Sequence, residues 1–301
     1  MDDRLNWDRD GRCWPHREAS RFVSAGGLKW HVQILGQGPV ILLIHGTGSS
    51  THSWRRLIPL LRQSFTIIAP DLPGHGFTSM PATTQLSLPG MAEAMSELLH
   101  TLGVEPIMAI GHSAGAAVAI RSTIDRCIKP DVIVSINGAL LPFESQIGKF
   151  FSPLAKLLVS APMVPQFLAW RARSRDAVES VLLGTGSHVE SEDVDLYARI
   201  FRNVGHVSGA LGMMANWDLR SLAHDLPRLS TKLVLINASN DKAIAPSEAR
   251  GIAQIVPNAE IKTLKGLGHL AHEERPDDVA EVILAVFRAA DAPPAESRAC
   301  G

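Results

Sequence analysis

Two kinds of segment alternate along the chain: short runs of consecutive apolar residues, and longer stretches in which apolar residues recur every three or four positions. Continuous apolar runs are typical of strands buried on both faces, because helices cover both sides of a parallel sheet. The alternation therefore predicts an α/β fold, with a mostly parallel sheet flanked by helices. The predicted strands are 40–44, 65–69, 107–110, 132–134, 233–236 and 259–264.

A hairpin and a helix mark the two ends of this pattern. Residues 21–23 and 29–34 flank Ala25-Gly26-Gly27, which predicts an antiparallel hairpin leading into the sheet. Pro276 suits a first helical position, two aspartates follow it, and apolar residues then recur at helical spacing as far as Phe287. We therefore expect a single helix to close the domain.

Residues 140–225 interrupt the alternation, because they contain helical stretches with prolines and glycines but no convincing buried strand. We predict a helical insertion there, called the lid below, on a core formed by residues 1–139 and 226–290. Residues 291–301 have no apolar periodicity, and we expect them to form a disordered tail.

Composition and charge narrow the classes of function. The 301 residues are 46% apolar and 20% charged, and 29 basic side chains nearly balance 30 acidic ones, so the chain lacks the positive excess of a nucleic-acid-binding protein. Cys13, Cys127 and Cys300 match neither a disulfide framework nor metal-ligand spacing, which indicates a reducing compartment. The charged N-terminus lacks a secretory signal, and prolines break the most apolar stretch, 150–170, so we predict a cytoplasmic protein without a transmembrane segment.

The strongest chemical signal follows the predicted strand 107–110. Gly111-His112-Ser113-Ala114-Gly115 leads into a helix-compatible run, which gives the strand, G-x-S-x-G and helix order of a nucleophile elbow. Its glycines allow a tight turn, in which the strained serine backbone costs roughly 1–3 kcal/mol. We therefore identify Ser113 as the candidate nucleophile, with a simple tight turn as the alternative.

A nucleophilic serine needs a base, and the base needs an orienting acid. His269 lies between the predicted strand 259–264 and the last helix, so its side chain can reach the carboxyl edge of the sheet. Asp241 follows the strand 233–236, where it is either the acid or a turn-forming residue. The chain order serine, acid, histidine is the order found in the α/β-hydrolase fold.

Acyl transfer also needs hydrogen-bond donors for the oxyanion. We expect these to be the backbone amides of Ala114, just after the nucleophile, and of Thr47, in the loop His45-Gly46-Thr47-Gly48. This loop lacks the third glycine of a dinucleotide-binding fingerprint. His269-Leu270-Ala271-His272-Glu273 matches no zinc-protease spacing, so we expect neither a metal nor a cofactor, and His272 would line the cleft or hold its loop.

Together these motifs resemble the α/β-hydrolase superfamily over nearly the whole chain. Within it, the chain resembles the magnesium chelatase accessory proteins of bacteriochlorophyll synthesis, and the specific motif is Leu211-Gly212-Met213-Met214-Ala215-Asn216-Trp217-Asp218 in the lid. The resemblance implies an α/β-hydrolase fold with a helical lid and a role near the insertion of magnesium into protoporphyrin, with magnesium chelatase as a partner. It implies no particular reaction.

The lid independently favours a large apolar ligand. Met213, Met214 and Trp217 are adaptable or flat side chains suited to packing a macrocycle, although the apolar residues of the lid could equally form its own core. Three arginines would pair with ligand carboxylates or form a solvated helix face. They are Arg171, Arg173 and Arg175.

These inferences combine into one hypothesis and two alternatives. The hypothesis is an α/β-hydrolase whose serine chemistry acts on a small apolar ester or acyl substrate, such as a tetrapyrrole, at or near the magnesium chelatase step. It would act in the cytoplasm or at the surface of the photosynthetic membrane. The alternatives are a general carboxylesterase with no pigment role, and a tetrapyrrole-binding protein that keeps the triad as a relic.

Overall fold

The computed structural model describes residues 4–142, 161 and 163–291. Part of the predicted lid and nearly all of the predicted tail therefore lie outside the described residues. Eight strands form a single sheet. They are β1 (Ser20–Ala25), β2 (Leu28–Gly36), β3 (Val40–Ile44), β4 (Thr66–Pro70), β5 (Met108–His112), β6 (Val132–Ile136), β7 (Lys232–Ala238) and β8 (Ala259–Leu264).

The strand order across the sheet is β1-β2-β4-β3-β5-β6-β7-β8. β2 pairs antiparallel with both β1 and β4, and every later pairing, from β4 with β3 to β7 with β8, is parallel. This arrangement confirms the predicted mostly parallel sheet and the entry hairpin. It also places β5, which leads into the G-x-S-x-G motif, in the middle of the sheet with β3 and β6 on either side.

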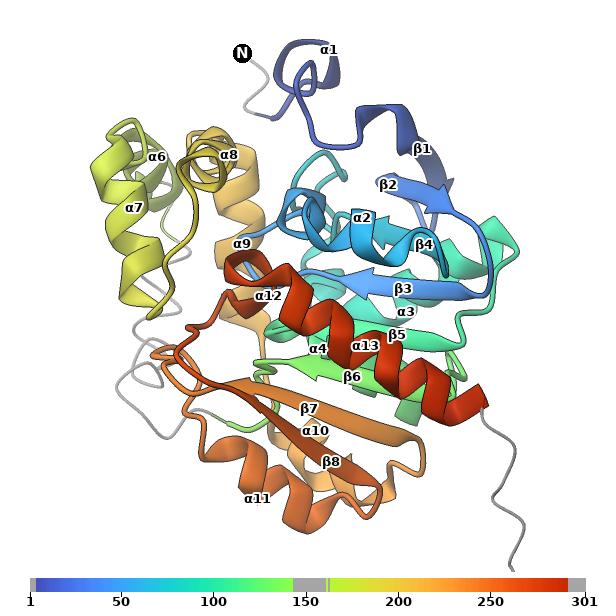
Figure 1. Ribbon diagram of the computed structural model, residues 1–301. Helices are drawn as coiled ribbons and strands as arrows, with labels where there is room; N and C mark the ends of the chain where they lie inside the picture. The colour runs from blue at the N-terminus through green and yellow to red at the C-terminus, as the bar shows by residue number, and fades with distance from the viewer. Residues whose placement is uncertain (1–3, 143–160, 162, 292–301) are drawn as a thin grey trace, which may run out of the picture.

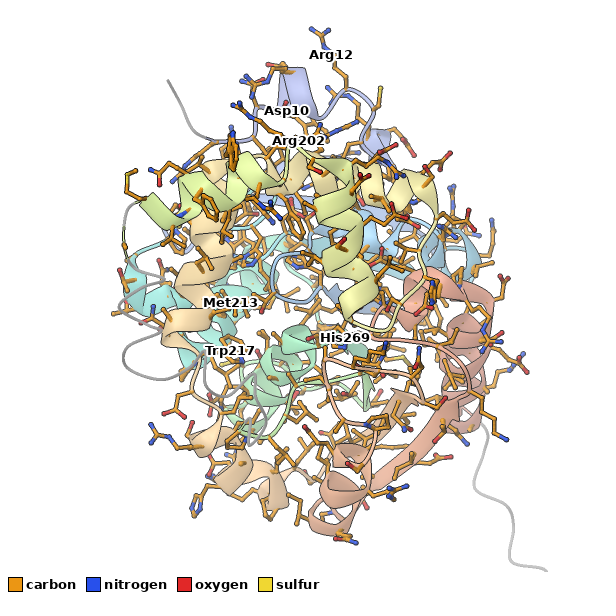
Figure 2. All side chains as sticks on the ribbon, turned by 90° about the vertical axis from the view of Figure 1, so that its left-hand side faces the viewer. Asp10, Arg12, Arg202, Met213, Trp217 and His269 are labelled. Carbon is orange, nitrogen blue, oxygen red and sulfur yellow. The ribbon has the colours of Figure 1, made fainter. Side chains whose placement is uncertain are left out.

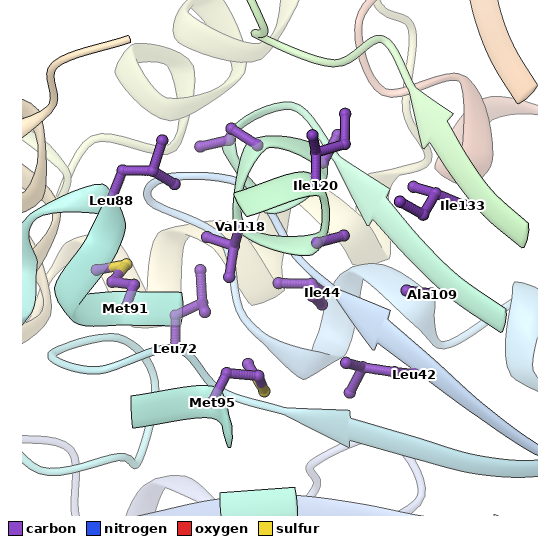
Figure 3. Close-up of a cluster of buried hydrophobic side chains, with 14 of the residues drawn as sticks. Leu42, Ile44, Leu72, Leu88, Met91, Met95, Ala109, Val118, Ile120 and Ile133 are labelled. Carbon is purple, nitrogen blue, oxygen red and sulfur yellow. The ribbon is translucent and has the colours of Figure 1, made fainter. Parts of the chain in front are cut away.

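Helices cover both faces of the sheet, as the continuous apolar strands require. On one face, α2 (Leu57–Leu61) and α13 (Pro276–Asp291) share a buried cluster with the strands. On the other face, α3 (Leu88–Leu102) and α4 (Ala114–Ile124) pack on the strands, so that Ile44, Met91 and Val118 belong to one cluster (Figure 3). The same cluster includes α10 (Arg220–Asp225) and α11 (Glu248–Ile255).

The described part of the lid consists mainly of four helices, which stand at the end of the sheet toward which the arrows of β3 and β6 point (Figure 1). They are α6 (Met163–Arg171), α7 (Arg175–Gly184), α8 (Ser191–Phe201) and α9 (Val204–Asn216). A separate apolar cluster, which includes Val178 of α7 and Val194 of α8, forms a core within the lid. Trp14 and Leu270 extend this cluster to the N-terminal segment, which carries α1 (Trp7–Asp10), and to the chain just before α12 (Ala271–Glu274).

The boundary between lid and core at residues 225 and 226 stays a prediction. α10 lies inside the predicted lid, yet its Leu222 is completely buried in the cluster that contains α4. None of the helices within the described residues is long and apolar enough to cross a membrane.

Candidate active site

Ser113 lies at the sharp turn between β5 and α4, and its backbone is strained. Its φ and ψ angles are 51° and −119°, outside the regions that side chains with a Cβ normally occupy. Three backbone hydrogen bonds hold this conformation. The Ser113 amide donates to the carbonyl of Ile136 at 3.0 Å, and its carbonyl accepts the amides of Ala116 and Ala139, each at 3.1 Å. Backbone hydrogen bonds therefore hold Ser113 in its strained conformation.

The two glycines of the motif are required by close backbone approaches. A Cβ on Gly115 would lie 2.1 Å from the carbonyl oxygen of Ile44, and a Cβ on Gly111 would lie 2.3 Å from the amide nitrogen of Ala116. Real Cβ atoms do not come so close to backbone atoms. The motif therefore presents Ser113 at the N-terminus of α4 while packing against the end of β3.

Asp241 and His269, predicted as acid and base, are joined by a hydrogen bond of 2.8 Å between His269 Nδ1 and Asp241 Oδ2. The other carboxylate oxygen, Oδ1, accepts the amides of Ala243 at 2.8 Å and Ile244 at 2.9 Å. Because the carboxylate can only accept, the His269 Nδ1 carries the proton. This leaves Nε2 as the nitrogen able to take a proton from a nucleophile.

Ser113, the candidate nucleophile, is connected to this pair through the preceding residue, His112. The imidazole ring of His112 lies 4.7 Å from that of His269, centroid to centroid, and its Nε2 donates to the His269 carbonyl at 3.0 Å. Within the described residues, neither Ser113 Oγ nor His269 Nε2 forms a hydrogen bond. Catalytic hydrogen bonds are often long in free enzymes and shorten when a substrate binds. The structure therefore brings all three residues to one edge of the sheet with the serine hydroxyl unengaged.

The predicted oxyanion loop passes directly beside Ser113. A Cβ on Gly46 would lie 3.0 Å from Ser113 Cβ, and Gly48 has a φ of 74°, which favours glycine. His45 fixes the loop, because its Nε2 accepts the amide of Leu72 and its Nδ1 donates to the Gly46 carbonyl, each at 2.8 Å. Burial lowers the pKa of His45, which keeps the ring neutral in this arrangement.

The two amides proposed to hold the oxyanion have no backbone acceptor among the described residues. In residues 4–142 and 163–291, neither Thr47 nor Ala114 donates its amide to a backbone carbonyl. Ala114 is the first residue of α4, where amides have no partner inside the helix. Both donors therefore remain available to a ligand oxygen.

Asn137 is a positioning residue that the sequence analysis did not identify. Its Nδ2 donates to the carbonyls of His269 at 2.8 Å and Gly268 at 3.1 Å, and its Oδ1 accepts the amide of Ala238 at 2.8 Å. One side-chain amide thus joins the ends of β6 and β7 to the histidine loop. The sequence signal that could have identified Asn137 is its position directly after β6, a central strand.

The lid supplies another set of unpredicted contacts, at residues 185–187, which connect α7 to α8. The carbonyl of Thr185 accepts the amides of Lys242 at 3.0 Å and His269 at 3.3 Å, and Ser187 Oγ accepts the amide of Leu270 at 2.8 Å. In Figure 2, His269 accordingly lies at the lower end of α7. We call this contact between the lid and the catalytic loops the seam.

An apolar cavity of about 490 Å³ lies between the lid and the oxyanion loop. This volume is typical of small-molecule sites, which measure roughly 300–1,000 Å³. Ser113 is not one of the lining residues, whereas the oxyanion loop contributes two. The described lining consists of Thr47, Gly48, Phe167, Leu168, Arg171, Ala172, Ala177, Val178, Val181, Phe201, His206, Val207, Ala210, Leu211 and Met214.

The three lid residues predicted to bind substrate occupy different positions. Met214 lines the cavity. Met213 is completely buried and Trp217 nearly so, and both belong to the main core cluster on the α4 side of the sheet. Met213 also contacts the oxyanion loop, since its Sδ accepts the hydroxyl of Thr47 at 3.4 Å. Figure 2 shows Met213 and Trp217 at the lower end of α9.

His272 is completely buried, and its environment is mainly aromatic. Its ring lies 4.5 Å from that of His112 and 4.6 Å from that of Trp54. Burial lowers its pKa to about 3, so it is neutral at physiological pH. Among the described residues, no three potential ligands lie close enough together to hold a metal ion.

Comparison with known proteins agrees with this architecture. A model of the alpha/beta hydrolase family matches residues 41–282. The magnesium-chelatase 30 kDa subunit of Rhodobacter capsulatus is 36% identical over 273 residues, which cover 90% of this chain and 95% of that protein. The epoxide hydrolase CorEH is 23% identical with a TM-score of 0.73, covering 90% of this chain and 99% of the other. Epoxide hydrolase VrEH1 from Vigna radiata is 22% identical with a TM-score of 0.72, covering 90% and 97%.

Proposed function

This chain belongs to the alpha/beta hydrolase family, and from that premise we propose that it is a serine hydrolase of bacteriochlorophyll synthesis, acting at or near the magnesium chelatase step. The observation that supports the chemistry is the hydrogen bond between Asp241 and His269 beside a strained Ser113. The relationship to the magnesium-chelatase subunit supports the pathway. Magnesium chelatase is the proposed protein partner, and the cytoplasm or the photosynthetic membrane surface is the proposed place of action.

The proposed reaction has two stages, acylation of Ser113 and hydrolysis of the acyl-enzyme, and the same catalytic groups act in both. Ser113 Oγ bonds to the substrate carbonyl carbon while its proton moves to His269 Nε2, and Asp241 stabilises the resulting imidazolium. The carbonyl oxygen, now negative, accepts the amides of Thr47 and Ala114. Collapse of the intermediate breaks the bond to the leaving group, which takes the proton from His269. A water molecule, deprotonated by His269, then attacks the carbonyl carbon of the acyl-enzyme. The bond to Ser113 Oγ breaks, and Ser113 takes the proton from His269.

The proposed substrate is an apolar ester of tetrapyrrole size. The cavity beside Thr47 is lined mostly by apolar side chains, and Met214 gives it an adaptable wall. Because Met213 and Trp217 lie in the core cluster, we propose that they support this wall, and that direct contact with substrate falls to Met214.

The test of the chemistry is covalent labelling with a fluorophosphonate probe. Labelling should require both the hydroxyl and its base, so Ser113→Ala should abolish it and His269→Ala should reduce it by at least a hundredfold. Ser221→Ala, on the exposed surface of α10, is the matched control and should label like the wild type. Equal labelling of wild type and Ser113→Ala would eliminate the serine-hydrolase proposal.

A second candidate function is tetrapyrrole binding without catalysis, which is favoured by the absence of Ser113 from the described cavity lining. The two functions can be distinguished in a strain that lacks the gene for this protein. Each variant is expressed there at the same protein level, and the pigment yield is measured. If hydrolysis is required, Ser113→Ala should restore no pigment. If binding is sufficient, Ser113→Ala should restore pigment fully, whereas Met214→Asp, which places a charge on the cavity wall, should not.

A further inference from the structure

Among the described residues that line the apolar cavity, one side chain is charged. Eleven of its fifteen described lining residues are apolar, and Arg171, at the C-terminal end of α6, is the only charged one. Within the described chain, its guanidinium forms no hydrogen bond or ion pair. Arg171 is also exposed, so it stands where the cavity meets solvent. As far as the described residues go, this guanidinium at the cavity mouth is therefore available to a ligand.

Two neighbouring arginines do not share this position. Arg175 bonds to Asp195 at 3.1 Å and to Glu179 at 3.2 Å, which engages its guanidinium on the lid surface. Arg173 is exposed but does not line the cavity. Of the three arginines that the sequence offered as carboxylate partners, the structure therefore selects Arg171.

The other polar side chains of the lining are already engaged. His206 Nδ1 accepts the amide of Gly76 at 3.0 Å, so its Nε2 carries the proton and donates to the Gly48 carbonyl at 3.1 Å. The Thr47 hydroxyl donates to a methionine sulfur. At one end of the cavity this leaves the Thr47 amide, and at the mouth it leaves the Arg171 guanidinium, as donors for a ligand.

We propose that Arg171 binds a carboxylate on an otherwise apolar ligand, so that the site selects amphiphilic carboxylic acids. The position of the reacting carbonyl near Thr47 rests on the proposed function, whereas binding of the acid does not. A guanidinium presents two parallel N–H donors that match a carboxylate, and its single charge balances a single carboxylate. A dianionic phosphate would leave excess negative charge against an apolar wall. The substrate class is therefore an apolar ester that retains one free carboxylate.

Binding of a fluorescent acid tests this proposal without requiring catalysis. The probes are 4-(1-pyrenyl)butyrate and its primary amide, which has nearly the same shape and no charge, and both are titrated against the protein carrying Ser113→Ala. The acid should bind about tenfold more tightly than the amide, since a hydrogen bond to a charged group is stronger than one to a neutral group and solvent weakens it at an exposed site. Adding Arg171→Gln should reduce this preference to less than about twofold.

Arg173→Gln is the matched control, because it removes the same charge two residues away and off the cavity. It should keep the preference for the acid, and Arg171→Lys should keep part of it through charge alone. Failure of the acid to bind, equal binding of acid and amide, or an equal loss in Arg171→Gln and Arg173→Gln would overturn the proposal. Fluorophosphonate labelling of Ser113 is independent of this outcome, so either proposal can fail alone.

Discussion

In the sheet, the apolar side chains of β3 from Ile41 to Ile44 are completely buried, whereas in the lid Met163, Phe167 and Trp170 of α6 are each more than half exposed. These three residues are spaced at i, i+4 and i+7, so they lie along one face of the helix. A central strand has helices on both sides, and its side chains have no alternative to the core. The lid helix has one side packed and one side open, so its apolar residues are not explained by folding alone.

The largest expected difference between the two regions is in stability. Leu43→Ala should lower the free energy of unfolding by about 2–5 kcal/mol, because it leaves a cavity in a packed core. Trp170→Ala should change it by less than about 0.5 kcal/mol, since the side chain is largely exposed. Urea unfolding of both variants measures this contrast. A loss of several kcal/mol in Trp170→Ala would show that α6 is part of the folding core after all.

Acid should weaken the contact between lid and core, where His206 is buried. Burial lowers the pKa of His206 to about 4, below the ordinary 6.5, so the unfolded chain binds the proton first. The stability contributed by the neutral ring is therefore complete above pH 6.5 and is lost as the pH falls toward 4, by on the order of 3 kcal/mol. Thermal unfolding across this range should show less acid sensitivity in His206→Gln. The exposed His100→Gln is the control and should follow the wild type.

The seam should be sensitive in activity as well as in stability. A Cβ on Gly268 would lie 2.2 Å from the backbone carbon of Gly186, so Gly268→Ala should separate the lid from the histidine loop. We expect a loss of about 1–3 kcal/mol in stability and at least a tenfold slower fluorophosphonate labelling. Gly184→Ala, at the end of α7 with open space around it, should instead be stabilising by up to about 1 kcal/mol. Unchanged labelling in folded Gly268→Ala would mean that the seam does not position His269.

The smallest effect is expected at Glu273, which accepts the hydroxyl of Tyr197 from the lid at 2.7 Å. Burial raises the pKa of Glu273 well above its usual range, so the folded protein keeps this carboxyl protonated to a higher pH than the unfolded chain does. Its contribution to stability is complete at low pH and is lost as the pH rises from about 4.5 toward the raised pKa. Glu273→Gln should match the wild type within about 1 kcal/mol at pH 5 and become the more stable protein by pH 8. Exposed Glu281→Gln should show no such crossover.

The sequence predicted the sheet well because buried strands leave a simple pattern. The predicted strand 40–44 has the same bounds as β3, and 259–264 the same as β8. Asp241 and His269 lie in the loops after β7 and β8, as expected from the strands that precede them in the sequence. The elbow was recognisable because it combines a local motif with a local strand and helix.

The remaining parts of the site depend on segments that meet only in three dimensions. Thr185 lies more than eighty residues from His269 in the sequence, and no periodicity indicates that its carbonyl accepts the His269 amide. In the lid, the sequence could not distinguish the environments of Met213 and Met214 either. Adjacent residues on a helix point in directions about 100° apart, so the pattern could not decide which of them faces a cavity and which the core.

The seam also constrains how the lid could move to admit a ligand. Because the Thr185 carbonyl holds amides in both the acid loop and the histidine loop, raising the lid at that end would release the backbone of His269. A ligand that entered past Phe167 and Arg171 of α6, which line the cavity, would leave these hydrogen bonds in place. Ligand exchange on the α6 side would then leave the alignment of His269, the candidate base, unchanged.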